Sequence, residues 1–120
     1  MSTTTSGLGD TIRRAVEGRD AAALAGLYAE DASVTVVDRA TPPSSPRRIH
    51  GRDEIAAYLA DVCSREMSHE VRDYVEGEGR LAHTEHCRYP DGTRVLCMTV
   101  ADLDADRRIA RQTIVQAWDE

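Results

Sequence analysis

The two residues that we single out as candidates for proton transfer are His86 and Asp38. An imidazole donates and accepts protons near neutral pH, and a carboxylate that is partly removed from water can act as a general base. Asp38 ends a predicted strand at residues 34–38, where an aspartate also commonly starts a turn and caps the next loop. A histidine within a sheet can likewise be satisfied by neighbouring hydroxyl groups. Both residues therefore have a structural as well as a catalytic interpretation.

The position of His86 follows from a predicted hairpin. Strands are expected at residues 80–89 and 93–103, and Asp91-Gly92 between them is typical of a two-residue turn, which would pair Pro90 with Thr93. Side chains alternate between the two faces of a strand, so this register decides which residues lie together. The residues that it places on one face include Thr84, His86, Cys97 and Thr99.

The cysteines and histidines predict neither a disulfide nor a metal site. Cys63, Cys87 and Cys97 are widely spaced and form no Cys-x-x-Cys motif, so free thiols of a reducing compartment are expected. The hairpin register also puts Cys87 and Cys97 on opposite faces, which argues against a bond between them. Cys97 could be a nucleophile beside His86, but no activating group flanks it, and a small buried residue is the alternative. His83 and His86 point to opposite faces of one strand, so no metal ligand set is predicted.

The elements that must position these side chains are predicted to be mostly helices in the N-terminal half of the chain and strands in the C-terminal half. Helices are expected at residues 10–17, from Asp20 through Tyr28 and from Gly51, and strands at 34–38, 69–76, 80–89, 93–103 and 108–118. Residues 39–48 contain three prolines and are expected to form a loop. This order predicts an α+β domain. We expect a flexible tail at residues 1–9 and a single domain at 10–120.

Composition excludes several classes of partner. The net charge is −6, and all fifteen basic residues are arginines, so a basic face for nucleic acid is not expected. No apolar run approaches the roughly eighteen residues that span a bilayer, and the N-terminus has no apolar signal segment. These observations predict a cytoplasmic protein that binds neither nucleic acid nor membrane.

Four segments carry a family resemblance through their order and spacing. They are Gly18-Arg19-Asp20, the run from Leu27 to Val34, the run from Ile49 to Ile55, and the closing Val115-Gln116-Ala117-Trp118. In this order they resemble the nuclear transport factor 2-like superfamily, and within it the SnoaL-like and ketosteroid-isomerase-like branch, over residues 10 to 119. The resemblance implies a cone, in which three N-terminal helices pack on a strongly curved antiparallel or mixed sheet around a cavity. Members of the superfamily include isomerases, polyketide cyclases, dehydratases, epoxide hydrolases and non-catalytic binding domains, and homodimers are common.

The resemblance also implies which chemistry is missing. Ketosteroid isomerases use a carboxylate base with a tyrosine and a protonated acid that bind the developing oxyanion. By similarity, the base position falls on Val36, the tyrosine on Ile12 and the acid on Thr99. All three groups are absent, so ketosteroid isomerase activity is not expected.

The position of Thr99 implies that its face of the sheet lines the cavity. The opposite face, with Met98, Val100 and Val115, would then be free for a second copy of the chain. We expect His86 and Asp38 as acid and base. The predicted ligand contacts are Tyr28, Tyr58, Thr84, Cys97, Thr99, Gln112, Gln116 and Trp118.

The predicted function is cofactor-independent proton transfer of the isomerase, cyclase or dehydratase type on a polyketide-like or other lipophilic metabolite. Its motivation is a polar cluster within an apolar cavity. The alternative is a non-catalytic ligand-binding or dimerisation module of the same fold. No cofactor and no metal are expected in either case.

Overall fold

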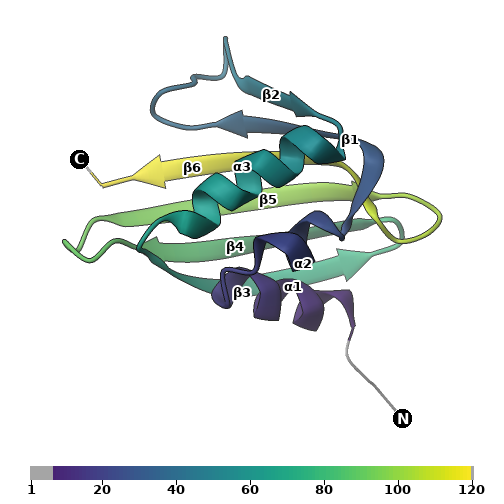
Figure 1. The fold of residues 1–120 in the computed structure, drawn as a ribbon, viewed down its shortest axis with the longest axis horizontal. Coiled ribbons are helices and arrows are strands. Elements are labelled where there is room, and N and C mark those ends of the chain that lie inside the picture. Colours follow the sequence, from purple (N-terminus) through teal and green to yellow (C-terminus); the bar gives the residue numbers. More distant parts are fainter. Residues whose placement is uncertain (1–6, 120) are drawn as a thin grey trace.

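The computed structural model describes residues 7–119, which form three helices and a six-stranded sheet. The helices are α1 (Leu8–Glu17), α2 (Ala21–Ala25) and α3 (Arg52–Ser64), and the strands are β1 (Tyr28–Val37), β2 (Arg47–His50), β3 (Ser68–Gly77), β4 (Arg80–Arg88), β5 (Arg94–Leu103) and β6 (Ile109–Trp118). All three helices lie on the same side of the sheet (Figure 1). This architecture confirms the predicted α+β fold class with a mixed sheet.

Local signals in the sequence set the starts of the helices. Asp20 accepts a hydrogen bond from the backbone N–H of Ala23 at 3.0 Å and is the predicted N-cap of α2. Gly51 precedes α3 with a φ of +88°, a conformation that favours glycine. Helix α1 begins at Leu8, two residues before the predicted start, so Leu8 and Gly9 of the predicted tail at 1–9 are helical, and residues 1–6 of that tail lie outside the described residues. Within the described range, no helix combines the length and the apolar character needed to cross a bilayer.

Two segments predicted as helix or loop are strands. Tyr28, predicted to close the second helix, opens β1, and Arg47 and Arg48, predicted in a loop, belong to β2. A register shift in the pairing of β1 with β6, between Tyr28 and Ser33, interrupts the alternation that would have revealed the long strand. Strand β2 lies at the edge of the sheet and pairs with β1 alone, so its sequence needs only one inward side chain, Ile49.

The sheet is bent around its core. Its strand order is β2-β1-β6-β5-β4-β3, with β1 and β6 parallel and every other pair antiparallel. Bulges interrupt three of the ladders, and the one in β3 lies between Arg72 and Val75, where Asp73 has a φ of +53°. Such bulges increase twist and curvature, so the inner face closes on the helices. The most deeply buried large side chains of the core are Val34, Val36, Ile55 and Leu81.

The predicted register of the β4–β5 hairpin is wrong by one residue. Tyr89 and Thr93 flank a three-residue loop, with the Tyr89 N–H donating to the Thr93 carbonyl at 2.9 Å. The favoured two-residue turn for Asp91-Gly92 needs a positive φ at both residues, but only Gly92 adopts one, at +94°. Arg88 therefore pairs with Arg94, and β4 is turned over relative to the prediction. The inward residues of β4 are Leu81, His83, Glu85 and Cys87, while Thr84 and His86 face outward.

Candidate functional site

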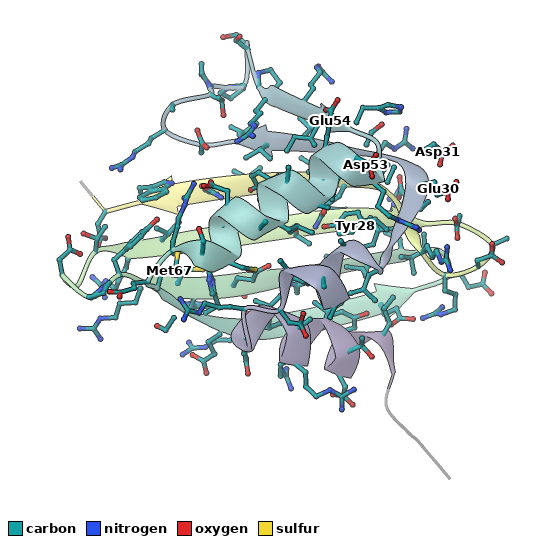
Figure 2. The ribbon with its side chains drawn as sticks, viewed as in Figure 1. Tyr28, Glu30, Asp31, Asp53, Glu54 and Met67 are labelled. Atoms are coloured by element: carbon teal, nitrogen blue, oxygen red, sulfur yellow. The ribbon has the colours of Figure 1, made fainter. Side chains whose placement is uncertain are left out.

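A cavity of about 150 Å³ lies between the helices and the inner face of the sheet. The helices supply apolar walls, among them Ile12 and Val16 from α1 and Leu59 from α3. Figure 2 shows Tyr28 near the N-terminal end of α3 and Met67 beyond its C-terminal end, and both residues line the cavity. The sheet supplies most of the polar groups, so the cavity is apolar on one side and polar on the other.

Seven of the residues expected at the site line the cavity. They are Tyr28, Asp38, Tyr58, Cys97, Gln112, Gln116 and Trp118. Cys97 on β5 and Gln116 on β6 lie directly opposite each other. Their neighbours along the two strands, Met98 and Val115, are exposed on the other face. The parity predicted for β5 and β6 is therefore the one that the structure adopts.

His86 and Thr84 do not line the cavity. His86 is exposed on the outer face of the sheet, and the Thr84 hydroxyl bonds to Asp73 Oδ2 at 3.0 Å. Both positions follow from the one-residue change of register in β4. The prediction that His86 lies at the centre of the site is therefore wrong. A warning was present in the predicted register, since it turned Arg88 inward, and arginine is almost never buried without a partner.

Thr99 lies behind the cavity wall as part of a buried hydrogen-bond chain. The Tyr28 hydroxyl donates to Gln112 Oε1, and Gln112 Nε2 donates to Thr99 Oγ1 at 3.0 Å. Arg52 at the start of α3 holds the backbone carbonyl of Tyr28 with two N–H groups, at 3.2 and 2.6 Å. Burial raises the pKa of Tyr28, so its hydroxyl stays protonated. This chain fixes the amide of Gln112 and leaves it little freedom to turn toward a ligand.

Asp38 has the structural role that its position allowed. Its Oδ1 accepts hydrogen bonds from Ala40 N at 2.8 Å, Thr41 N at 2.8 Å and the Thr41 hydroxyl at 2.9 Å. Partial burial raises the pKa of this carboxyl group, but the bonds from Thr41 and Ala40 outweigh it and hold the pKa below its usual range. A carboxylate stabilised in this way is a weak base, although it does lie at the cavity.

Glu85 is the carboxyl group that faces the cavity from the middle of the sheet. It pairs with Val71 on β3 and with Cys97 on β5, and its side chain is 22% exposed. Burial raises its pKa to about 7, with a further increase from negative charge on Cys87 and an opposing effect of His69. A carboxyl group with this pKa can both take and return a proton at neutral pH.

His83 lies beside Glu85 with an unpaired ring nitrogen. Its Nδ1 is 3.8 Å from Glu85 Oε2, too far for a hydrogen bond, and finds no other partner among residues 7–119. The ring stacks on Tyr74 at 6.1 Å, and burial lowers the pKa of His83 despite a backbone hydrogen bond at Thr84. The imidazole is therefore neutral, and its unpaired Nδ1 is buried.

His69 and Cys87 form a pair on the adjoining strands β3 and β4. His69 Nδ1 lies 3.1 Å from Cys87 Sγ, and the two residues are direct cross-strand neighbours. Cys87 and Cys97 share the inner face, which corrects the prediction that they point apart, and both thiols are free. Potential ligand atoms of His69, Glu85 and Cys87 lie within 4.8 Å of one another. The structure already pairs two of these groups with each other, so we interpret the cluster as acid–base and thiol chemistry.

Tyr58 and Trp118 complete the polar side near charged groups. The Arg47 guanidinium lies 5.1 Å from the Tyr58 ring centre, and burial raises the pKa of Tyr58 to about 12. Its hydroxyl is therefore a proton donor rather than an anion at neutral pH. The Arg39 guanidinium lies 4.1 Å from the Trp118 ring centre, and the Trp118 N–H donates to Gln116 Oε1 at 3.1 Å.

The sequence did not predict the polar inward residues of β3 and β4 as part of the site. They are His69, His83, Glu85 and Cys87, all of which line the cavity. The alternation of side chains along residues 81–87 is visible in the sequence. The assumed two-residue turn placed the residues of the other face in the cavity. The sequence signal that could have identified them is Pro90, which favours the second position of a turn over residues 89–92 and so, with Gly92 as the fourth, a three-residue hairpin loop.

Comparison with known proteins places this architecture in a family. The family model for the SnoaL-like domain matches residues 10–112. No curated protein matches the chain. A nuclear transport factor 2-like protein from Mesorhizobium loti superposes with a TM-score of 0.77 at 17% identity, covering 88% of this chain and 84% of the other.

Two further solved structures are similar to the chain over most of its length. A protein from Sphaerobacter thermophilus gives a TM-score of 0.67 at 25% identity, covering 93% of this chain and 97% of the other. SalBIII, an epoxide hydrolase/cyclase-like enzyme in pyran ring formation of the polyether salinomycin, gives 0.65 at 18% identity, covering 87% and 83%. At such identities these likenesses establish the fold.

Proposed function

Because the chain belongs to the SnoaL-like domain family, we propose that it is a cofactor-independent proton-transfer enzyme of the isomerase, cyclase or dehydratase type. Its substrate would be a polyketide-like or other lipophilic metabolite. The observation that supports this proposal is Glu85, a carboxyl group with a pKa of about 7 on the polar side of the cavity. Glu85 replaces His86 and Asp38 as the proposed acid–base group. The cyclase-like chemistry attributed to SalBIII is of the same general kind.

The arrangement around Glu85 suits removal of a proton from a carbon next to a carbonyl group. The carboxylate would take the proton and return it to another position of the substrate. Negative charge would develop on the carbonyl oxygen, and the protonated hydroxyl of Tyr58 on α3, which also lines the cavity, would be its donor. Val36 and Ile12, which take the positions of the ketosteroid isomerase base and tyrosine, are part of the hydrophobic core.

The cavity volume limits what can enter it. About 150 Å³ accommodates roughly one six-membered ring, so a larger metabolite would insert one ring or branch. The remaining contacts would come from the aromatic and cationic groups near Trp118 and Tyr58, beside Arg39 and Arg47. We further propose a cytoplasmic location, since three free cysteines fit a reducing compartment.

Exchange of carbon-bound hydrogen tests the proposal without knowledge of the natural substrate. The purified protein is incubated in D₂O with small cyclic ketones and enones, and deuterium uptake next to the carbonyl is followed by NMR. Glu85→Gln should lower the exchange rate by about 100-fold, within the usual range for a general base. Glu78→Gln, at an exposed position in the β3–β4 turn, is the matched control and should leave the rate unchanged. Equal rates for Glu85→Gln and the unaltered protein would reject Glu85 as the base.

A non-catalytic binding module is the alternative, and a dimer is compatible with either function. Compounds that raise the melting temperature but exchange no hydrogen in the unaltered protein would favour the binding module. Exposed apolar side chains on the outer face of the sheet support dimerisation through that face. They are Val75, Leu96, Met98, Val100 and Val115.

A further inference from the structure

We propose that Cys87 is a nucleophile for α,β-unsaturated carbonyl compounds that enter the cavity, with His69 as its proton acceptor. Cys87 Sγ lies 3.1 Å from His69 Nδ1, and both residues line the cavity. The two residues face each other directly across β3 and β4, so the backbone ladder fixes the pair. The proposal uses the cavity of the proposed function but does not depend on proton transfer by Glu85, so either can fail alone.

Access to Cys87 is confined to the cavity. The residue is only 3% exposed on the molecule as a whole, yet it is part of the cavity wall. A reagent must therefore fit the cavity to reach the sulfur atom. Selection by size is expected, because about 150 Å³ accepts a small planar molecule and excludes a bulky one.

The groups around Cys87 favour its thiolate form. The hydrogen bond from Cys97 on β5 lowers the pKa of Cys87 most, and burial opposes it. The bond and charge of His69 on β3 lower it further, with a smaller contribution from His86 on β4. Glu85 is the acidic neighbour, and its raised pKa keeps much of it neutral beside the thiolate.

His69 is correspondingly poised to hold the proton. Its hydrogen bond to Cys87 raises the pKa of the imidazole, and burial together with the charge of Arg19 opposes the increase. Thiolate and imidazolium therefore stabilise each other, as in enzymes in which a neighbouring histidine activates a cysteine.

The covalent step balances without an additional reagent. The Cys87 thiol passes its proton to His69 Nδ1, and the sulfur attacks the β-carbon of the unsaturated carbonyl compound. One S–C bond forms, and the electron pair of the C=C bond moves to the α-carbon and carbonyl oxygen as an enolate. The His69 imidazolium returns the proton to the α-carbon, which completes a thioether adduct. The same steps in reverse eliminate the Cys87 thiol from the adduct and restore the C=C bond.

The other two cysteines are internal controls. Cys63 lies in α3, and burial raises its pKa. The pKa of Cys97 is also raised, because it donates its hydrogen bond to Cys87 and is itself buried. Trypsin separates all three onto different peptides, since Arg65, Arg80, Arg88 and Arg94 divide the segments that contain them.

The rate of alkylation by acrylamide tests the proposal. Fully reduced protein is treated in the presence of EDTA, quenched at intervals and digested, and each cysteine peptide is quantified by mass spectrometry. At pH 7 Cys87 should react at least about 10-fold faster than Cys63, and its rate should persist at pH values where ordinary thiols are protonated. Cys87 reacting no faster than Cys63, or losing its rate in step with Cys63 as the pH falls, would overturn the proposal.

Two variants identify the role of His69. His69→Gln should lower the rate at Cys87 by about 10-fold and leave the rate at Cys63 unchanged, with folding checked by circular dichroism. His50→Gln on the exposed edge strand β2 is the matched control and should change neither rate. An unchanged Cys87 rate in folded His69→Gln would overturn the pairing. Glu85→Gln separates the two proposals, because it should lower the rate of hydrogen exchange by about 100-fold while alkylation of Cys87 continues.

Discussion

Glu85 makes the stability of the protein depend on pH. Its ordinary pKa is 4.5, and burial raises it to about 7 in the folded chain. Below about pH 4.5 both the folded and the unfolded chain hold the proton, and Glu85 adds no penalty. Between the two values the unfolded chain releases the proton that the folded chain retains, so the free energy of unfolding falls as pH rises. Above about pH 7 the penalty is complete.

Glu85→Gln should therefore stabilise the protein selectively at high pH. We expect a gain on the order of 2 kcal/mol at pH 8 relative to pH 4, less than the full shift implies because solvent reaches part of the side chain. Urea unfolding across this pH range measures the difference. Glu78→Gln supplies the baseline for an exposed position. If the free energy of unfolding changed with pH by the same amount in Glu85→Gln and in the unaltered protein, the raised pKa of Glu85 would be contradicted.

Strands β5 and β6 show what an alternating pattern can predict. Once the inward position of Thr99 was assumed, the period of two placed Cys97 and Gln116 correctly along their strands. Strand β4 has the same clear period, but its phase depends on the number of residues in one turn. Asp91-Gly92 is compatible with two turn geometries that differ by one residue, so this dipeptide alone could not assign the face of Glu85. The cavity was thus predictable in outline, and its acid–base group was not.

The β4–β5 turn depends on the conformational freedom of Gly92. A Cβ atom added there would meet no atom within 4 Å, so the φ of +94° is the main source of strain for alanine. Gly92→Ala should lower the free energy of unfolding by about 1 kcal/mol. Gly77→Ala also adds a methyl group in open space, but without a positive φ, and it should be neutral or slightly stabilising. Urea midpoints of the two variants give the comparison, and equal midpoints would argue against the three-residue loop.

At the scale of the whole molecule, the helices cover one face of the sheet and leave the other uncovered (Figure 1). The outer face presents Met98 on β5 directly beside Val115 on β6, with exposed fractions of 55% and 45%. A further row runs from Val75 on β3 through Ala82 on β4 to Val100 on β5. Contiguous apolar side chains of this kind on a sheet are typical of a protein interface. A second copy of the chain is the partner that we propose.

A charged residue at the centre of this face should separate the dimer. Met98→Glu places a carboxylate where a partner sheet would exclude water, and an unpaired buried charge costs several kcal/mol. Because Met98 is exposed in the single chain, the variant should fold normally and elute as a monomer in size-exclusion chromatography with light scattering. Ala60→Glu, on the exposed side of α3, introduces the same charge away from the sheet and should remain dimeric. A monomeric unaltered protein, or a dimeric Met98→Glu variant, would rule out this interface. Because the cavity lies on the opposite face of the sheet, the monomeric variant should still bind ligands in it.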